Sequence, residues 1–197
     1  MKRLIVICCL LTITCMVSAQ QKNSAGSWRF HSINSVGLME GETGSAFQLQ
    51  TVNGAGYKSW FGGIGIGLDY YRYRTIPLFF DLKKEFGKSR NKVFVYADLG
   101  TNFCWLTDNQ KMSYRTDDQY HNGIYSDLGL GYKVAVGKNN GFLLSLGYSY
   151  KKITETYQSY YYYTTPYMNF TDPPKDLPTE KINYGLNRLT IKMGWEF

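Results

Sequence analysis

The sequence predicts an all-β fold, an eight-stranded antiparallel up-and-down transmembrane β-barrel that follows a cleaved signal peptide. Three observations lead to this prediction. The chain begins with a leader that has the parts of an export signal, most of the remaining chain alternates apolar and polar residues, and short and long connections alternate between the alternating segments. The 197 residues are 44% hydrophobic and include 20 glycines, which excludes a disordered tail and a collagen-like repeat.

The first 19 residues are predicted to be a signal peptide, and residues 20–197 the barrel domain. A basic start at Lys2 and Arg3 precedes an apolar stretch over 4–17, and the small residues Ser18 and Ala19 supply a cleavage site. The stretch is too short to span a membrane comfortably as a helix. A lipidated Cys15 is disfavoured, because Thr14 precedes it where a small residue is usual.

Composition after the leader limits the chemistry available. Loss of Lys2 and Arg3 leaves 20 basic against 15 acidic residues, a formal charge of +5, and only Cys104 remains of the four cysteines. An internal disulfide is therefore impossible, and one cysteine with two histidines is too few for a tetrahedral zinc site. We expect no metal and no cofactor. The basic residues are scattered along the chain, so nucleic acid is not a predicted partner.

Eight segments alternate with the period of two that is typical of strands. They are 28–38, 45–52, 60–71, 75–86, 92–103, 123–137, 142–151 and 188–197. The first keeps parity least well. In chain order, the apolar faces of the others carry Phe47 and Leu49; Ile64, Ile66, Leu68 and Tyr70; Ile76, Leu78, Phe80 and Leu82; Val93, Val95, Ala97 and Leu99; Leu128, Leu130, Tyr132, Val134 and Val136; Phe142, Leu144, Leu146, Tyr148 and Tyr150; and Leu189, Ile191, Met193, Trp195 and Phe197.

The opposite faces of these segments are rich in glycine and carry single charges of both signs. The acidic residues are Asp69, Asp81, Glu85, Asp98, Asp127 and Glu196, and the basic residues are Lys83, Lys133, Lys151, Arg188 and Lys192. A narrow barrel interior needs such a balance, because an unpaired buried charge is costly. These residues are therefore predicted to form a charge network that plugs the barrel, with the glycines making room for it.

The connections support the same topology. Counted from a periplasmic N-terminus, the turns 53–59, 87–91 and 138–140 are short, the first two outer loops at 40–44 and 71–74 are brief, and outer loops 3 and 4, at 108–122 and 154–183, are the longest. Aromatic residues are predicted at both strand ends, as in interfacial girdles. The outer set is Tyr70, Phe103, Trp105, Tyr148, Tyr150 and Tyr184, and the periplasmic set is Trp60, Phe86, Phe94, Phe142, Trp195 and Phe197.

The segment 188–197, with its alternating apolar positions and final Phe197, resembles the last strand of bacterial outer-membrane barrels. Segments 32–38 and 76–79 resemble the small outer-membrane β-barrel proteins of the Bacteroidota, with an architecture like that of OmpX and OmpA. The resemblance implies an integral protein of the Gram-negative outer membrane, with membrane lipid and lipopolysaccharide as surroundings. It also implies recognition by the barrel-assembly machinery, with Trp195 and Phe197 as the assembly signal.

A barrel of eight strands has room only for its own side chains, so function is expected in the outer loops. The fourth loop is rich in tyrosine, which suits recognition of an extracellular protein or glycan ligand. Its candidate residues are Tyr157, Tyr160, Tyr161, Tyr162, Tyr163 and Tyr167. Alternatively, the last two strands extend beyond the membrane and these tyrosines pack on one another or on lipopolysaccharide. The predicted role is structural or adhesive, and not enzymatic.

Two other classes of protein remain as alternatives. A lipid A-modifying outer-membrane enzyme needs a His and a Ser on one strand face, and neither His31 nor His121 has that surrounding sequence. An exported soluble lipocalin-like barrel is suggested by Gly26 and Trp28, but such a barrel places its apolar face inward and ends in a helix. This chain ends in a predicted strand.

Overall fold

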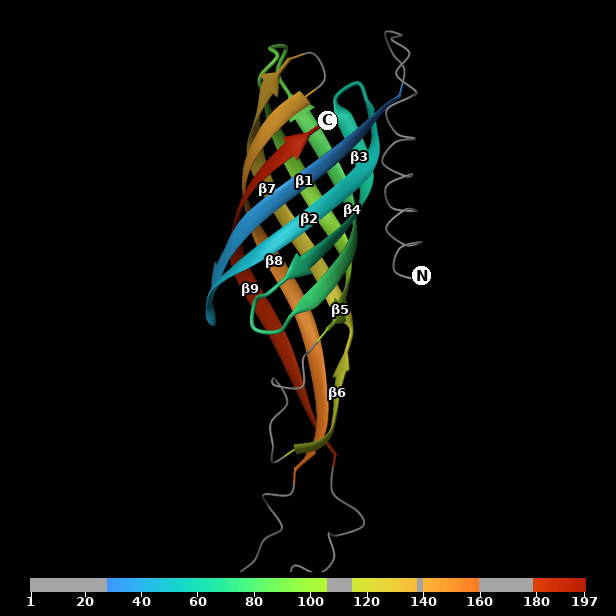
Figure 1. Cartoon of the computed structure of the whole chain (residues 1–197), viewed down its shortest axis with the longest axis vertical. Coiled ribbons are helices and arrows are strands. Elements are labelled where there is room, and N and C mark those ends of the chain that lie inside the picture. The colour runs from blue at the N-terminus through green and yellow to red at the C-terminus, as the bar shows by residue number, and fades with distance from the viewer. Residues whose placement is uncertain (1–27, 106–114, 138–139, 160–178) are drawn as a thin grey trace, which may run out of the picture.

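The computed structural model describes residues 28–105, 115–137, 140–159 and 179–197, which form one closed β-barrel (Figure 1). The strands are β1 (Arg29–Gly41), β2 (Gly44–Tyr57), β3 (Trp60–Asp69), β4 (Thr75–Phe86), β5 (Lys92–Cys104), β6 (Arg115–His121), β7 (Gly123–Val136), β8 (Asn140–Ser159) and β9 (Thr179–Glu196). Among the described residues, none belongs to a helix long and apolar enough to cross a membrane. The signal peptide predicted over 1–19 lies outside the described residues.

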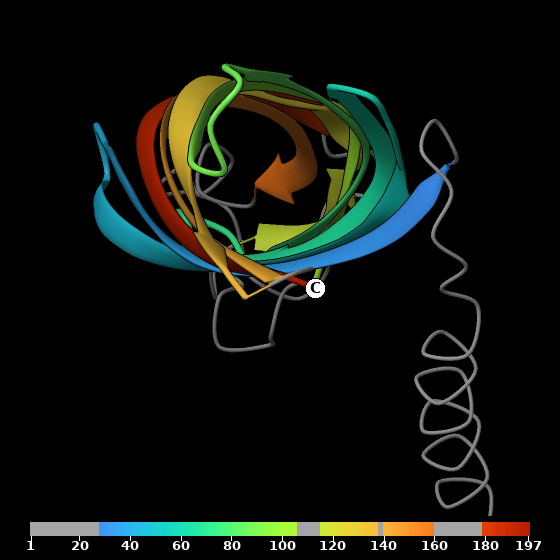
Figure 2. The ribbon, with the colours of Figure 1, turned by 90° about the horizontal axis from the view of Figure 1, so that it is seen from above.

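Eight strands make the wall of the barrel, which confirms the predicted fold. Neighbours in the chain pair antiparallel from β1 to β5, β5 pairs with β7, and β7 with β8. The last strand, β9, pairs with both β8 and β1, from Ile33 opposite Glu196 to Gly41 opposite Arg188. The ladder therefore closes and leaves no edge among the eight strands of the wall, as the view along the barrel shows (Figure 2).

The ninth strand, β6, continues β7 beyond the wall. His121 pairs with Thr154 on β8, and Tyr125 on β7 pairs with Lys151 on the same strand, so β6 and β7 follow one another along β8. They are separated at Asn122, whose side-chain oxygen accepts a hydrogen bond from the backbone N–H of Cys104 at 3.3 Å. The interruption thus ties the extension to the end of β5.

The two ends of the barrel differ. At one end, here called the proximal mouth, β1 begins, β9 ends, and the turns between β2 and β3, between β4 and β5 and between β7 and β8 are short. At the other end, the distal mouth, β6, β8 and β9 run on past the remaining strands (Figure 1). The predicted parity of short turns on one side and long connections on the other is present in the structure.

Several predicted boundaries were wrong, and all for the same reason. The turn predicted over 53–59 shrinks to Lys58 and Ser59, and the predicted loops 108–122 and 154–183 contain β6, the end of β8 and the start of β9. In these regions both faces of the strand are polar or small, so no alternation reveals them. The backbone ladder nevertheless continues, because its hydrogen bonds do not depend on apolar side chains.

The outer surface of the wall is an apolar belt. Phe80 is 71% exposed, and Leu128 and Leu99 are each 64% exposed. The belt further includes Val36, Leu38, Phe47, Leu49, Ile64, Ile66, Leu78, Leu82, Val93, Val95, Leu130, Tyr132, Val134, Leu144, Leu146, Tyr148, Leu189, Ile191 and Met193. An apolar surface this large is far beyond what a water-soluble monomer exposes. The polarity of this barrel is inverted relative to that of a soluble protein.

The girdle prediction needs two corrections. Phe94 and Tyr184 face the interior: Phe94 is buried in the wall's inner cluster, and the Tyr184 hydroxyl donates a hydrogen bond to Glu155. The parity of β5 and β9 places them there, since Val93 and Val95 take the outward positions beside Phe94. Aromatic residues that do face outward at the proximal end are Trp60, Phe86, Phe142, Trp195 and Phe197, and those at the distal end include Tyr70, Phe103, Trp105 and Tyr148.

The depth of the belt predicts how β9 tolerates charge. Ile191 lies within the belt and Asn187 lies beyond it, and both side chains face outward on β9. We expect Ile191→Arg to destabilise the barrel by about 2–4 kcal/mol and Asn187→Arg by about 0–1 kcal/mol, because the cost of a lipid-facing arginine depends on depth. Urea unfolding of both variants in lipid bilayers checks this. Equal destabilisation by the two substitutions would contradict the assigned belt.

Candidate functional site

Charged side chains fill the interior of the barrel in layers, and β9 contributes one residue to each layer. Arg188, Lys192 and Glu196 are spaced four apart, so all three point inward along the strand. All three are buried. Each one meets partners from strands on the opposite side of the lumen, and these sets of residues are called here the distal, middle and proximal tiers.

The distal tier is built around Asp69 at the end of β3. Its carboxylate forms ion pairs with Arg188 and with Lys151 on β8, the latter at 3.1 Å. Arg188 also donates to the Ser149 hydroxyl at 2.6 Å, and the Lys151 ammonium donates to the Thr75 hydroxyl at 3.1 Å. Two cations around one carboxylate are therefore supported by neutral acceptors, as a buried network requires.

In the middle tier, acidic groups outnumber basic ones. Asp81, Asp98 and Asp127 occupy paired positions across β4, β5 and β7, and all three are buried. Lys192 reaches them from β9, 3.1 Å from Asp127 and 3.6 Å from Asp98. The Tyr96 hydroxyl donates to Asp127 at 2.9 Å, whereas the Oδ1 atoms of Asp81 and Asp98 have no hydrogen-bond partner among the described residues. This tier therefore has three carboxyl groups for one ammonium group.

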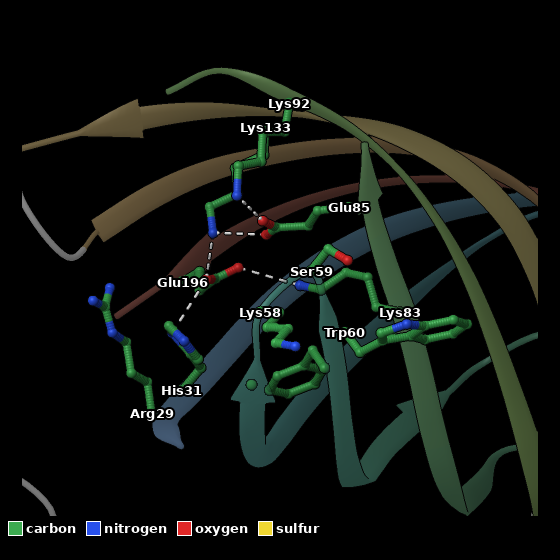
Figure 3. Close-up of a pocket in the computed structure, with 12 residues that line it drawn as sticks. Arg29, His31, Lys58, Ser59, Trp60, Lys83, Glu85, Lys92, Lys133 and Glu196 are labelled. Atoms are coloured by element: carbon green, nitrogen blue, oxygen red, sulfur yellow. Dashed lines mark hydrogen bonds and ion pairs between the residues drawn. The ribbon is translucent and has the colours of Figure 1, made fainter. Parts of the chain in front are cut away.

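The proximal tier is built around Glu196. Its carboxylate lies 3.2 Å from the Lys83 ammonium and 2.6 Å from that of Lys133, and Lys133 also contacts Glu85 at 2.9 Å. The chain of contacts is visible from the mouth (Figure 3). Lys133 therefore joins β9 to β4 through two carboxylates.

The structure thus brings together the whole set of charges that the sequence pointed inward. The residues are Asp69, Asp81, Lys83, Glu85, Asp98, Asp127, Lys133, Lys151, Arg188, Lys192 and Glu196. Three neutral residues of inward parity, Ser149, Thr75 and Gln50, were not predicted to take part in this network. The first two accept hydrogen bonds from Arg188 and Lys151, and the Gln50 side-chain oxygen accepts one from Lys192 at 3.3 Å. Sequence reasoning also missed which charges pair, since the partners lie on strands far apart in the chain.

The inner face is less polar than predicted. An apolar cluster of Ile33, Val52, Phe61, Phe79, Phe94, Tyr96, Tyr125 and Leu143 lies among the tiers. The glycines make room for these rings at least as much as for charges: a Cβ at Gly65 would meet the Phe79 ring, and one at Gly131 would meet the Phe94 ring. Aromatic bodies and ion pairs together occupy the lumen.

The extension at the distal mouth carries a cluster of tyrosines around Glu155, here called the distal collar. Glu155 is fully buried and accepts hydrogen bonds from Tyr120 at 3.0 Å and Tyr184 at 2.7 Å. Burial, followed by the hydrogen bond to Glu155, raises the pKa of Tyr184, so its hydroxyl stays a donor at neutral pH. The collar covers the apolar cluster of Met39, Tyr71, Ile153 and Leu186.

Tyr157 belongs to this extension, and its assignment to the fourth loop was wrong. It lies on β8, is buried, and its hydroxyl donates to Glu180 on β9 at 2.6 Å. The β8–β9 ladder continues past it to Gln158 and Thr179, which places it on a strand. The other loop candidates, Tyr160, Tyr161, Tyr162, Tyr163 and Tyr167, lie outside the described residues.

The C-terminal residues Trp195 and Phe197 face the outer surface, with exposed fractions of 41% and 49%. The backbone of Phe197 exchanges two hydrogen bonds with Ser32 on β1, at 2.9 and 3.0 Å, and so completes the closing seam. Their role as an assembly signal stays a prediction. No group of three or more His, Cys, Asp or Glu residues within the described part of the chain is arranged to hold a metal ion.

Comparison with known proteins identifies the fold. No family model and no curated protein matches the sequence. The crystal structure of neisserial surface protein A (NspA) matches with a TM-score of 0.55 and 12% identity, over 88% of this chain and 98% of that one. The outer membrane protein OprG from Pseudomonas aeruginosa matches with a TM-score of 0.54 and 10% identity, over 89% and 98%. The chain has the fold of small outer-membrane β-barrels, as the resemblance implied.

The middle tier has more carboxyl groups than ammonium groups, and this predicts different effects of two similar substitutions on stability. Asp127→Asn removes the nearest counter-charge of buried Lys192, and we expect a loss of about 3 kcal/mol in the free energy of unfolding. Asp98→Asn replaces a buried carboxyl group that lies beside two others with a neutral amide of the same shape, and it leaves Lys192 paired with Asp127, so we expect a change within about 1 kcal/mol, or stabilisation. Urea unfolding in detergent micelles measures both. A loss at Asp98 as large as that at Asp127 would disprove this charge distribution.

Proposed function

We propose that the chain is an integral protein of the Gram-negative outer membrane with a plugged, polar interior. The apolar belt is the observation that carries this proposal, because a closed barrel whose outer surface is apolar is stable only when lipid surrounds it. The fold, shared with small outer-membrane barrels, supports the same location. Because outer-membrane barrels have their short turns on the periplasmic side, the proximal mouth faces the periplasm and the distal mouth faces the cell exterior. Membrane lipid, lipopolysaccharide and the barrel-assembly machinery are the partners that follow.

The tiers support a plugged interior. Ion pairs cross the lumen at three levels, and the cavity that lies within the middle tier, beside Asp81, Asp98 and Lys192, measures only about 50 Å³. Such a space holds a water molecule or two and is far below the volume of ordinary ligand sites. We therefore favour a structural or surface-interaction role over transport through the lumen.

The surface-interaction role is assigned to outer loops 3 and 4. The β8–β9 ladder runs past the distal collar to Gln158 and Thr179, and the chain between them carries Tyr160, Tyr161, Tyr162, Tyr163 and Tyr167. Tyrosine gives a large contact area at a small entropic cost, so an extracellular protein or glycan is the proposed ligand class. No enzymatic activity is assigned to this protein.

The soluble lipocalin-like alternative conflicts with the polarity of the barrel. A soluble carrier would face its apolar residues inward around a ligand, whereas Leu128, Leu130 and Leu146 here are all more than half exposed. The lipid A-modifying alternative finds no support around His31, whose nearest charged contact is Glu196 at 3.2 Å. A carboxylate next to a histidine without a nucleophile does not make a hydrolytic triad.

The membrane location is tested by fractionation and heat-modifiability of the full chain. We expect the protein in the outer-membrane fraction, with an unboiled band that migrates faster on a denaturing gel than the boiled band, because the closed ladder resists detergent until it is heated. A protein recovered in the periplasmic fraction without that shift would contradict the proposal and favour the lipocalin-like carrier.

The role of the loop tyrosines is tested with a combined variant, in which Tyr160, Tyr161, Tyr162, Tyr163 and Tyr167 are each changed to Ser. We expect the variant to keep the heat-dependent gel shift and to lose binding to the glycans or cell-surface proteins that the unaltered protein retains on an array. Thr164→Ala with Thr165→Ala is the control within the same segment. Binding that survives the five substitutions would remove these tyrosines from the proposal.

A further inference from the structure

The proximal mouth contains a cavity that the charge network of the interior does not fill. It measures about 290 Å³, and its lining includes Arg29 and His31 on β1, the turn residue Lys58, and Trp60 and Phe61 on β3 (Figure 3). An adjoining hollow of about 310 Å³ shares Arg29, His31, Lys92 and Lys133 with it and extends to Arg90 and Phe197. Together the two spaces reach the size of a small-molecule site.

The side chains that line both spaces are strongly basic. Six are cationic, namely Arg29, Lys58, Lys83, Arg90, Lys92 and Lys133, and two are acidic, namely Glu85 and Glu196. The middle tier, by contrast, has three carboxyl groups for the single ammonium group of Lys192. A concave, low-dielectric mouth lined by one sign of charge concentrates counter-ions.

Both acids of the mouth already have lysine partners. Glu196 contacts Lys83 and Lys133, and Glu85 contacts Lys133 and Lys92 at 2.9 and 2.7 Å. Glu85 and Glu196 therefore already form ion pairs with three of the six cations, namely Lys83, Lys92 and Lys133.

Arg29 and Lys58 are left without a carboxylate. Neither forms an ion pair within the described part of the chain; the one contact recorded for Lys58 places its ammonium 5.2 Å from the centroid of the Tyr57 ring. Both side chains lie around the same hollow as His31 (Figure 3). An exposed guanidinium and an exposed ammonium, both without a carboxylate partner among the described residues and beside the paired lysines, suit an anion that accepts several hydrogen bonds at once.

We propose that the proximal mouth is a binding site for a phosphate group. Arg29 and Lys58 bind the phosphate oxygens directly, and the paired lysines Lys83 and Lys133 line the inner side of the site. A phosphate is favoured over a carboxylate, because its charge of nearly two and its several acceptor oxygens match the surplus. The phosphate belongs to a soluble phosphate ester or to a lipid headgroup at the rim beside Phe197. That the site opens to the periplasm rests on the proposed membrane orientation, whereas the site itself does not.

The test is a titration of the full chain, refolded in zwitterionic detergent and shown to be folded by its heat-dependent gel shift. Glycerol 3-phosphate and short-chain phosphatidic acid are the two probes, and calorimetry at low salt measures their affinity. We expect saturable binding with one site per chain, weakened at least tenfold in the double variant Arg29→Gln, Lys58→Gln and weakened steeply by added salt.

The matched control is the double variant Lys152→Gln, Lys181→Gln, which removes the same charge from exposed positions at the distal end. It should bind as the unaltered protein does. Binding of glycerol 3-phosphate identifies a soluble ester as the ligand, and binding of phosphatidic acid alone identifies a headgroup; either supports the site. No saturable binding of either probe, or equal weakening in both double variants, would overturn it. Neither result depends on where the protein resides in the cell.

Discussion

Closure of the ladder between β9 and β1 is the constraint on which the rest of the structure depends. Once eight strands close, every second side chain points into a lumen too narrow for bulk water, and each charge there needs a partner. One strand contributes to this pairing at every level, since Arg188, Lys192 and Glu196 on β9 each reach one tier of charges across the lumen. The closing strand is thus also the strand that organises the interior.

The same closure explains the division of the outer surface. Outward positions carry Leu, Ile, Val and Phe where the wall is surrounded by lipid, and they turn polar where β8 and β9 continue beyond it, at Lys152, Asn187 and Asn183. Past that level the inward side chains include tyrosines that donate hydrogen bonds to Glu155. Within the described residues, the two ends of the lumen therefore differ: the distal end carries the tyrosine collar, and the proximal end carries a cavity with more basic than acidic side chains.

Alternation was enough to predict the wall and the side to which most of its residues point, although Phe94 and Tyr184 were placed on the wrong side. Asp127 and Leu128 are neighbours in the chain, and their opposite burial was predictable from parity alone. Pairing across the lumen was not, because Arg188 and Asp69 are 119 positions apart and meet only when the register of every strand between them is known. Tyr157 was misplaced for a related reason: beyond the lipid both faces of a strand are polar, so the pattern that marks a strand disappears while its hydrogen bonds continue. The surplus of cations at the proximal mouth is likewise a property of strand ends brought together by closure.

The inverted polarity of the barrel is tested most directly by the neighbouring residues Leu143 and Leu144 on β8. Leu143 is buried inside the barrel and Leu144 is exposed on the belt, although they are adjacent in the chain. Methyl-labelled protein in lipid nanodiscs reports on both, through nuclear Overhauser effects between leucine methyl protons and acyl-chain protons. The structure predicts strong lipid contacts at Leu144 and Leu146 and none at Leu143. Lipid contacts at Leu143, or water contacts throughout the belt, would contradict it.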